Sequence, residues 1–364
     1  MNNEHESDID VVEQARRRVA NVFGTAGRIV MNVSGGKDSV CLNDIVYKTI
    51  TSGRADPSKL EVVFIDEEAI YPCVERIVRG IRTQWLSLGV PFSWYCVQVR
   101  HYNCLNSLVN EESFVCWDAE KRDRWIRPMP KFAISSDPFL RERKDTYQSF
   151  LDRKYAHHVT LAGVRMQESI QRRAYMSGMG DQGKMFPIYD WKDTDVWQYI
   201  RDNGLEIPDA YLYMYQCGVP RNRMRISQFF SVDTVGNLVE MCKFYPHLFD
   251  RICAREPNAY LSMLYYDTEM FRRSKRKAKV QERGFTSYES EVKRLLSERW
   301  RYKDSASMRN AYKDCTKLML KYGPYLNESS YKYLFDMLQG GDPKHRLARA
   351  LEIGLKIQIA TMEE

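Results

Sequence analysis

Two spacings of apolar residues alternate along the first half of the chain. Short runs rich in β-branched residues predict strands, and the stretches between them carry apolar residues at helical spacing. The predicted strands are 28–33, 60–66, 94–99 and 158–164. The predicted helices are 1–27, 40–50, 73–88 and 193–203, the last one capped by Asp193 or Thr194. Strands that alternate with helices predict an α/β fold with a doubly wound, mostly parallel sheet of five strands.

Two parts of the chain depart from this alternation. Residues 100–156 are rich in Trp, Arg, Asn and Pro, which predicts an insertion carrying substrate-binding or lid elements. From residue 232 onward the apolar spacing is helical throughout. We therefore expect a first domain over 1–231 with an insertion at about 100–156, followed by an α-helical C-terminal region over 232–364.

The composition is that of a folded chain. Of the 364 residues, 44% are hydrophobic and 28% are charged, which excludes disordered, collagen-like and low-complexity classes. No apolar run reaches the ~18 residues of a membrane helix, and the polar start lacks the pattern of a signal peptide. We expect a cytoplasmic chain that does not bind a membrane.

The nine cysteines are irregularly spaced and contain no C-x-x-C pair. This usage predicts neither a disulfide framework nor a zinc ribbon, and it fits a reducing compartment. Cys96, Cys104 and Cys116 are too irregular for an iron–sulfur cluster, so none is expected.

The net charge of +7 is concentrated in one segment. Arg272 to Arg283 carries seven basic residues and one acid. Such a segment can contact the phosphates of DNA or RNA, or it can form a solvated helix surface. The sequence leaves both interpretations open.

The strongest chemical signal is the loop Ser34-Gly35-Gly36-Lys37-Asp38-Ser39, between a predicted strand and a predicted helix. Glycines let the backbone approach a ligand closely, and loop amides at a helix N-terminus favour an anion. The serine hydroxyls add donors and Lys37 adds positive charge, so phosphate or pyrophosphate is the expected ligand. The spacing is not that of a Walker loop. The alternative is an ordinary glycine turn that binds nothing.

This loop resembles the pyrophosphate-binding loop (PP-loop) of the adenine-nucleotide α-hydrolase-like superfamily. That group includes N-type ATP pyrophosphatases, small subunits of ATP sulfurylase and phosphoadenosine phosphosulfate (PAPS) reductases. Three more segments resemble PAPS reductase motifs, in the expected order over residues 28–230: Phe64-Ile65-Asp66, then Gly163 to Ser169 with Arg172 and Arg173, then Pro187 to Trp191 with Asp195-Val196-Trp197.

Two further segments resemble a subgroup of PAPS reductase-like proteins from phages and mobile elements, similar to the immunoglobulin-binding regulator A family. Trp117-Asp118 with Trp125 to Pro130 looks like the insertion of that subgroup. Tyr211 to Phe230 looks like its segment after the core.

The superfamily resemblance implies a site for ATP or PAPS. The nucleotide would bind through Ser34, Gly35, Gly36, Lys37, Asp38 and Ser39, with further contacts from Asp66, Gly163, Arg165, Glu168 and Arg172. Lys37, Asp38 and Arg165 would carry catalysis. Asp38 would contact Mg2+ or cap the following helix. Asp66 would contact ribose or metal, or have no catalytic role, and the neighbouring Glu67 and Glu68 leave the position of this acid open by one or two residues. Arg165 would bind phosphate or pair with Glu168.

The chain departs from PAPS reductases at the catalytic cysteine. Those enzymes carry a C-terminal Glu-Cys-Gly-Leu-His segment, which this sequence lacks. Cys217 is the remaining candidate nucleophile, because Arg221, Arg223 and Arg225 follow it closely and would lower its pKa. Its alternative is a non-catalytic turn after the core.

The favoured function is therefore an ATP pyrophosphatase or adenylyl-transferring enzyme of the PAPS reductase family, acting in sulfur transfer or nucleic-acid modification. Two alternatives stay open. One is a thiol-dependent PAPS reductase, and the other is a non-catalytic nucleotide sensor that binds nucleic acid through Arg272 to Arg283. The expected partners are an adenine nucleotide, DNA or RNA, a sulfur-donor or ParB-like protein, and a second copy of the chain.

Overall fold

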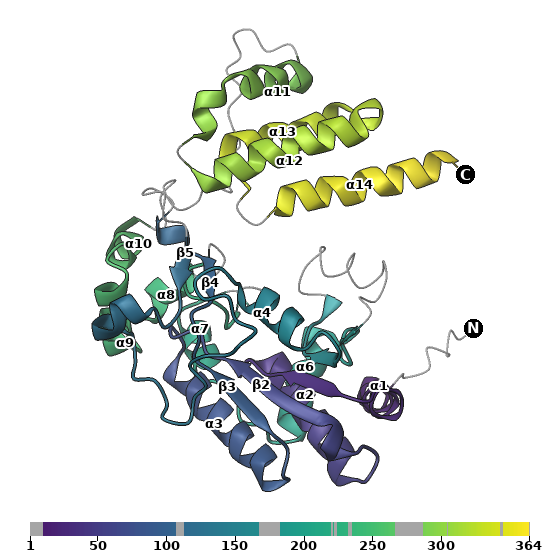
Figure 1. Cartoon of the computed structure of the whole chain (residues 1–364), viewed down its shortest axis with the longest axis vertical. Coiled ribbons are helices and arrows are strands. Elements are labelled where there is room, and N and C mark those ends of the chain that lie inside the picture. The colour runs from purple at the N-terminus through teal and green to yellow at the C-terminus, as the bar shows by residue number, and fades with distance from the viewer. Residues whose placement is uncertain are drawn as a thin grey trace, which may run out of the picture. The chain divides into compact units, whose positions relative to one another are not determined.

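The computed structural model describes residues 10–106, 113–166, 183–219, 221, 224–231, 235–265, 287–303, 305–342 and 345–363. The chain forms two compact units, each built from several segments (Figure 1). Unit 1 comprises Met1–His101, Val115–Phe229 and Glu240–Pro257, and unit 2 comprises Tyr102–Phe114, Phe230–Val239 and Asn258–Glu364.

A five-stranded sheet forms the centre of unit 1 (Figure 1). Its strands are β1 (Ile29–Asn32), β2 (Leu60–Ile65), β3 (Phe92–Tyr95), β6 (Val159–Ala162) and β7 (Lys184–Met185). Their order is β3-β2-β1-β6-β7, and every neighbouring pair is parallel. Because successive strands lie on opposite sides of β1, the order reverses between β1 and β6. Ligands of open α/β sheets bind at such a reversal, beyond the carboxyl ends of the strands.

Helices of unit 1 cover both faces of this sheet. The helices are α1 (Val11–Thr25), α2 (Lys37–Thr51), α3 (Pro72–Ser87), α4 (Tyr147–Lys154), α6 (Asp193–Asp202), α7 (Ala210–Gln216) and α9 (Pro246–Arg255). Successive residues of a strand point to opposite faces. Trp94 of β3 accordingly lies near the guanidinium of Arg79 on α3, whereas the ring of Tyr95 packs against Phe150 of α4. The expected α/β class with a parallel sheet is confirmed.

Three local expectations were wrong. The strand predicted over 94–99 is β3 (Phe92–Tyr95), and the chain then leaves the sheet, since the Val99 amide bonds the Val97 carbonyl. The N-cap of α6 is Lys192, rather than Asp193 or Thr194. The Asp195 carboxylate reaches back and accepts the Lys192 N–H at 2.7 Å, which moves the helix start. The strand predicted over 158–164 is shorter, because β6 ends at Ala162.

Most of the described chain after residue 232 is helical, as expected. Its helices are α8 (Val235–Met241), α9, α10 (Ala259–Tyr265), α11 (Tyr288–Ser297), α12 (Ala306–Tyr322), α13 (Glu328–Gly340) and α14 (Arg346–Glu363). The last four helices, all in unit 2, share an apolar core that includes Val292, Cys315, Leu334 and Leu355. No described helix has the length and apolarity needed to cross a bilayer.

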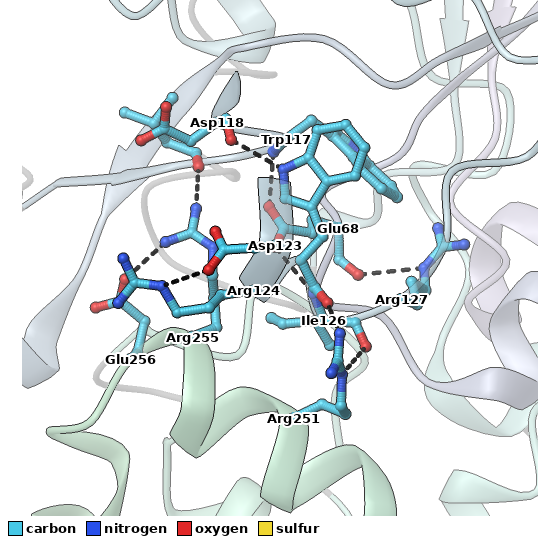
Figure 2. Close-up of polar contacts among 12 residues, drawn as sticks. Glu68, Trp117, Asp118, Asp123, Arg124, Ile126, Arg127, Arg251, Arg255 and Glu256 are labelled. Atoms are coloured by element: carbon cyan, nitrogen blue, oxygen red, sulfur yellow. Dashed lines mark hydrogen bonds and ion pairs between the residues drawn. The ribbon is translucent and has the colours of Figure 1, made fainter. Parts of the chain in front are cut away.

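The insertion contains the short strands β4 (Arg100–Tyr102) and β5 (Ser113–Val115), the 3-10 helix η3 (Ala119–Arg124), and α4. The part of it that belongs to unit 1 is held by Glu68, a fully buried carboxylate just beyond β2 (Figure 2). Its oxygens accept the Trp117 N–H at 2.7 Å, the Ile126 N–H at 3.1 Å and the Arg255 Nε–H at 3.1 Å.

Arg255 lies at the end of α9 and its side chain is also fully buried. It donates further hydrogen bonds to the Glu256 carboxylate at 3.2 Å and to the Val115 carbonyl at 2.8 Å. Arg251, one turn earlier on α9, donates to the carbonyls of Trp125 and Ile126 (Figure 2). One buried ion pair therefore joins the carboxyl end of β2, the insertion and α9.

Replacing Arg255 by alanine should lower the free energy of unfolding by about 3–5 kcal/mol, because the Glu68 carboxylate would remain buried without its cation. Arg76→Ala is the matched control, since that arginine pairs with Glu206 and Asp209 on an exposed surface of the same unit and such pairs contribute little. Urea unfolding followed by tryptophan fluorescence reports on unit 1, which contains every tryptophan except Trp300. Equal losses in the two variants would contradict the proposed importance of the buried pair.

Candidate functional site

The glycine-rich loop leaves β1 and enters α2 directly, with Gly36 as the helix N-cap. Gly35 has a φ of +72°, in the left-handed region that favours glycine. A Cβ at this position would lie 2.9 Å from Val74 Cγ1 and 3.0 Å from Val78 Cγ2 of α3. Both the backbone conformation and the packing against α3 therefore require glycine here.

Gly163 follows β6 and packs directly on the first turn of α2. A Cβ on Gly163 would lie only 2.8 Å from the carbonyl oxygen of Asp38 and 3.0 Å from the Cα of Ser39. Backbone cannot yield as a flexible side chain can, so the strand end and the loop approach each other closely only because residue 163 is glycine. This contact lies at the reversal of strand order between β1 and β6.

Hydroxyl groups hold the loop from inside. The Ser34 N–H donates to Ser39 Oγ at 2.9 Å, and the Gly36 N–H donates to Ser34 Oγ at 3.4 Å. The Lys37 N–H donates to the phenolic oxygen of Tyr211 at 3.2 Å. The two serines were expected to offer donors to a ligand, and in this structure they also accept hydrogen bonds from the loop backbone.

Two cations lie at the start of α2, and both are almost completely buried. Lys37 is 7% exposed and Arg165 is 3% exposed. Asp38 bridges them, because its Oδ1 lies 2.5 Å from Arg165 Nε and its Oδ2 lies 3.5 Å from Lys37 Nζ. Asp193 contacts the same two cations at longer range, with its Oδ1 3.6 Å from Lys37 Nζ and 3.4 Å from Arg165 Nη2.

Asp38 lies in the first turn of α2, one residue beyond Lys37, and its carboxylate faces Arg165. Magnesium prefers carboxylate and phosphate oxygens. Both carboxylate oxygens of Asp38 already contact cations, and the described residues contain no cluster of three or more His, Cys, Asp or Glu able to hold a metal ion. These residues by themselves do not form a magnesium site.

Asp66 lies directly after β2, as predicted, and is completely buried. Its carboxylate accepts hydrogen bonds from Trp94 Nε1 at 2.8 Å and from the Glu68 N–H at 3.1 Å, and it pairs with Arg127. Arg127 also contacts Glu75 at 2.9 Å. Protein groups of the insertion and of β3 thus engage the Asp66 carboxylate.

Glu67 is the next residue along the chain. Its Oε1 accepts a hydrogen bond from Gln228 Nε2 at 2.8 Å. Burial raises the pKa of Glu67 to about 7, the Gln228 hydrogen bond opposes the rise, and the Asp66 charge adds to it. A carboxyl group that titrates near neutrality at this edge of the sheet is suited to proton transfer.

The remaining residues predicted from the sequence either lie outside the described residues or follow α7. Glu168 and Arg172 lie outside the described residues, as do Arg223 and the basic segment Arg272 to Arg283. Cys217 is the C-cap of α7 and is partly exposed. Arg221 and Arg225 are exposed.

Sequence reasoning missed two residues of this site, Asp193 and Tyr211. Asp193 was considered only as a helix cap, although it stands two residues before the Asp195-Val196-Trp197 segment. Tyr211 opens the segment after the core and carried no role of its own. The run of acids at 66–68 left Glu67 open as an alternative to Asp66.

The model of the phosphoadenosine phosphosulfate reductase domain matches residues 28–217, which is more than half of the chain. The chain belongs to the PAPS reductase domain family. The match contains the loop, Asp66, Gly163, Arg165, Asp193 and Tyr211, and it ends at Cys217. Membership confirms the family expected from the motifs.

One relative of this family member is an uncharacterized protein, YbdN, of Escherichia coli (strain K12). The two sequences are 26% identical over 273 residues, which cover 68% of this chain and 65% of YbdN. The chain thus spans less than two thirds of the length of that relative.

Solved structures similar to this family member include three with low TM-scores. A PAPS reductase of Candida auris has a TM-score of 0.34 at 11% identity and covers 60% of this chain and 89% of its own. An FMN adenylyltransferase of Candida glabrata has 0.34 at 14% identity, with 58% and 63% covered. The U34-tRNA thiolase NcsA of Methanococcus maripaludis has 0.31 at 9% identity, with 69% and 79% covered.

The raised pKa of Glu67 predicts a pH dependence of stability. The folded chain holds a proton up to pH 7 that the unfolded chain releases above about pH 4.5, so the free energy of unfolding falls as the pH rises between these values. In Glu67→Gln this contribution is absent. Urea midpoints measured from pH 5 to 8 should therefore show the variant gaining on the natural chain up to about pH 7 and running parallel above it. Glu206→Gln, at an exposed carboxyl, should show no such gain, and parallel curves for Glu67→Gln throughout would refute the assignment.

Proposed function

We propose that the chain is a PP-loop ATP pyrophosphatase or adenylyl-transferring enzyme. The observation that carries this proposal is the pair of buried cations, Lys37 and Arg165, at the N-terminus of α2 and at the reversal of strand order. Loop amides, a helix N-terminus and two cations favour a polyphosphate at this position. Family membership supports an adenine nucleotide as its carrier.

In the proposed reaction an oxyanion of the acceptor attacks the α-phosphorus of ATP. The bond from that phosphorus to the bridging oxygen breaks, and pyrophosphate leaves with the electron pair. The adenylyl group remains on the acceptor. Positive charge fixed beside the leaving group stabilises the negative charge that develops on it. Lys37 and Arg165 supply that charge, and Asp38 orients Arg165 through the 2.5 Å contact.

The four charged side chains of the site nearly cancel one another before the nucleotide binds. Asp38 contacts Arg165 closely, whereas Asp193 is partly exposed and reaches the cations only at 3.4 Å and 3.6 Å. We propose that a phosphate replaces Asp193 and leaves the Asp38–Arg165 pair in place. Mg2+ would then bind through phosphate oxygens of the nucleotide.

The acceptor is proposed as a sulfur compound or a nucleic acid, delivered with a sulfur-donor or ParB-like partner. Residues 1–231, with the insertion at about 100–156, would form the catalytic domain, and 232–364 would serve partner or nucleic-acid binding. Arg272 to Arg283 is the segment proposed to contact DNA or RNA.

A thiol-dependent PAPS reductase is the second candidate. The observation that favours it is Cys217, which ends the same short helix whose first turn places Tyr211 on the loop. In that reaction a thiolate would attack the sulfur of PAPS, and 3′,5′-ADP would leave with the electron pair of the broken bond. A second thiol would then release sulfite and form the disulfide.

Turnover by the purified chain tests both functions. With Mg2+ and ATP, the proposal predicts AMP or an adenylylated acceptor together with pyrophosphate. Lys37→Ala should lower the rate by about 100-fold, in the range seen when a group that stabilises developing charge is removed. Lys48→Ala is the control, because Lys48 lies in the last turn of the same helix, where it pairs with Asp44.

Each outcome assigns one function. Pyrophosphate that is lost in Lys37→Ala and kept in Lys48→Ala supports the pyrophosphatase. Sulfite and 3′,5′-ADP from PAPS, lost in Cys217→Ser, would instead support the reductase. Nucleotide binding without turnover of either compound would overturn both enzymes and favour the sensor.

The charge balance of the site gives a separate prediction for binding. Asp193→Asn should bind inorganic pyrophosphate several-fold more tightly than the natural chain, because the carboxylate that competes for Lys37 and Arg165 is gone. Asp202→Asn, at the exposed end of the same helix α6, should leave the affinity unchanged. Isothermal titration at low ionic strength measures both, and weaker binding by Asp193→Asn would refute the competition.

A further inference from the structure

The side chain of Tyr211 reaches the N-terminus of α2, the helix that follows the glycine-rich loop. Tyr211 lies in the first turn of α7 and is only 5% exposed. Its ring lies beside Lys37, with Nζ 5.7 Å from the ring centroid, and edge-on to Trp197 at 5.8 Å. Its hydroxyl lies 3.4 Å from the position that a Cβ on Gly36 would take.

The Tyr211 hydroxyl accepts one hydrogen bond, and it can also donate its own proton. Its oxygen accepts the Lys37 N–H at 3.2 Å. A phenol can also donate one hydrogen bond, and buried donors in folded proteins are nearly always paired. Among the residues that the structure describes, none accepts the proton of the Tyr211 hydroxyl. The nearby carboxylate of Asp38 is engaged by Arg165 and Lys37.

We infer that the Tyr211 hydroxyl donates its proton to a phosphate oxygen of the bound nucleotide, so that the first amide of α2 acts on the phosphate through this tyrosine. This inference rests on the proposed function, because it names a further residue of the same phosphate site. The amide donates to the phenol, the phenol donates to the phosphate, and such chains strengthen each member.

The electrostatic surroundings suit a donor. Burial raises the pKa of Tyr211, and the hydrogen bond from Lys37 opposes that rise. The hydroxyl therefore stays protonated at neutral pH and adds a donor next to Lys37 without adding a charge. The two cations, Lys37 and Arg165, then supply the positive charge, and Tyr211 supplies direction.

A purely structural role makes a different demand on the hydroxyl. As a cap for α2 it needs only to accept the Lys37 N–H, and its loss would affect folding rather than one ligand group. As a phosphate donor it acts on the phosphate portion of the ligand alone. The two roles are separated by ligands that have or lack phosphate.

The test compares Tyr211→Phe with the natural chain in titrations of inorganic pyrophosphate, ATP and adenosine. The phenylalanine keeps the ring contacts and removes only the hydroxyl. The inference predicts that Tyr211→Phe binds pyrophosphate and ATP about tenfold more weakly, as expected for a lost hydrogen bond to a charged group, and binds adenosine as the natural chain does. Tyr215→Phe is the matched control, since Tyr215 is 63% exposed on the same helix and should change nothing.

Urea midpoints from tryptophan fluorescence establish that each variant is folded before titration. Unchanged pyrophosphate affinity in a folded Tyr211→Phe overturns this inference and leaves the proposed function intact. An equal loss for adenosine overturns it too, because the hydroxyl would then shape the site as a whole. If the natural chain binds neither pyrophosphate nor ATP, the proposed function fails, and the inference fails with it.

Discussion

The end of β6 lies directly against the first turn of α2, and the geometry of the carboxyl edge of the sheet depends on that close approach. Only glycine allows this close approach, because a Cβ at residue 163 would lie 2.8 Å from the Asp38 carbonyl oxygen. Arg165 follows two residues later, so its guanidinium reaches Asp38 while almost wholly buried. A larger residue at 163 would move the strand end from the helix and separate that ion pair. The buried Asp38–Arg165 ion pair near the loop thus depends on the absence of a side chain at Gly163.

A second constraint organises the other half of the same edge. Asp66 and Glu68 are both completely buried, and a buried carboxylate is tolerated only when cations and N–H groups engage it. Arg127 and Arg255 meet this demand, and they bring the insertion and α9 against the strand ends. Glu67 lies between them, and burial raises its pKa to about 7. Of these three acids, Asp66 and Glu68 pair with arginines of the insertion and α9, and Glu67 accepts a hydrogen bond from Gln228.

Local patterns in the sequence predicted the parallel sheet, the helices around it and the glycine-rich loop, because each is encoded by neighbouring residues. The end of β3 and the cap of α6 were not predicted, since a main-chain turn and the carboxylate of Asp195 decide them. Contacts between distant positions were also missed: Glu68 and Arg255 are 187 residues apart, and Lys37 and Tyr211 are 174 apart. No pattern of spacing links such pairs. Motifs identified the loop, whereas the groups that balance its charge appeared only once the chain was folded.

The balance of charge at the loop bears on which anions it would accept. Asp193 is itself a carboxylate and is tethered beside Lys37 and Arg165, so a free monocarboxylate gains little by replacing it. A pyrophosphate group brings more charge and several acceptor oxygens, which two cations and a row of N–H groups satisfy better than one carboxylate. Asp193 contacts the cations only at 3.4 Å and 3.6 Å, so it is the acid that the phosphate would replace. Asp38 contacts Arg165 at 2.5 Å and would stay in place. On the proposed function, the site is therefore selective for polyphosphate, because the Asp193 carboxylate that occupies it at rest offers less charge and fewer acceptor oxygens than a polyphosphate does.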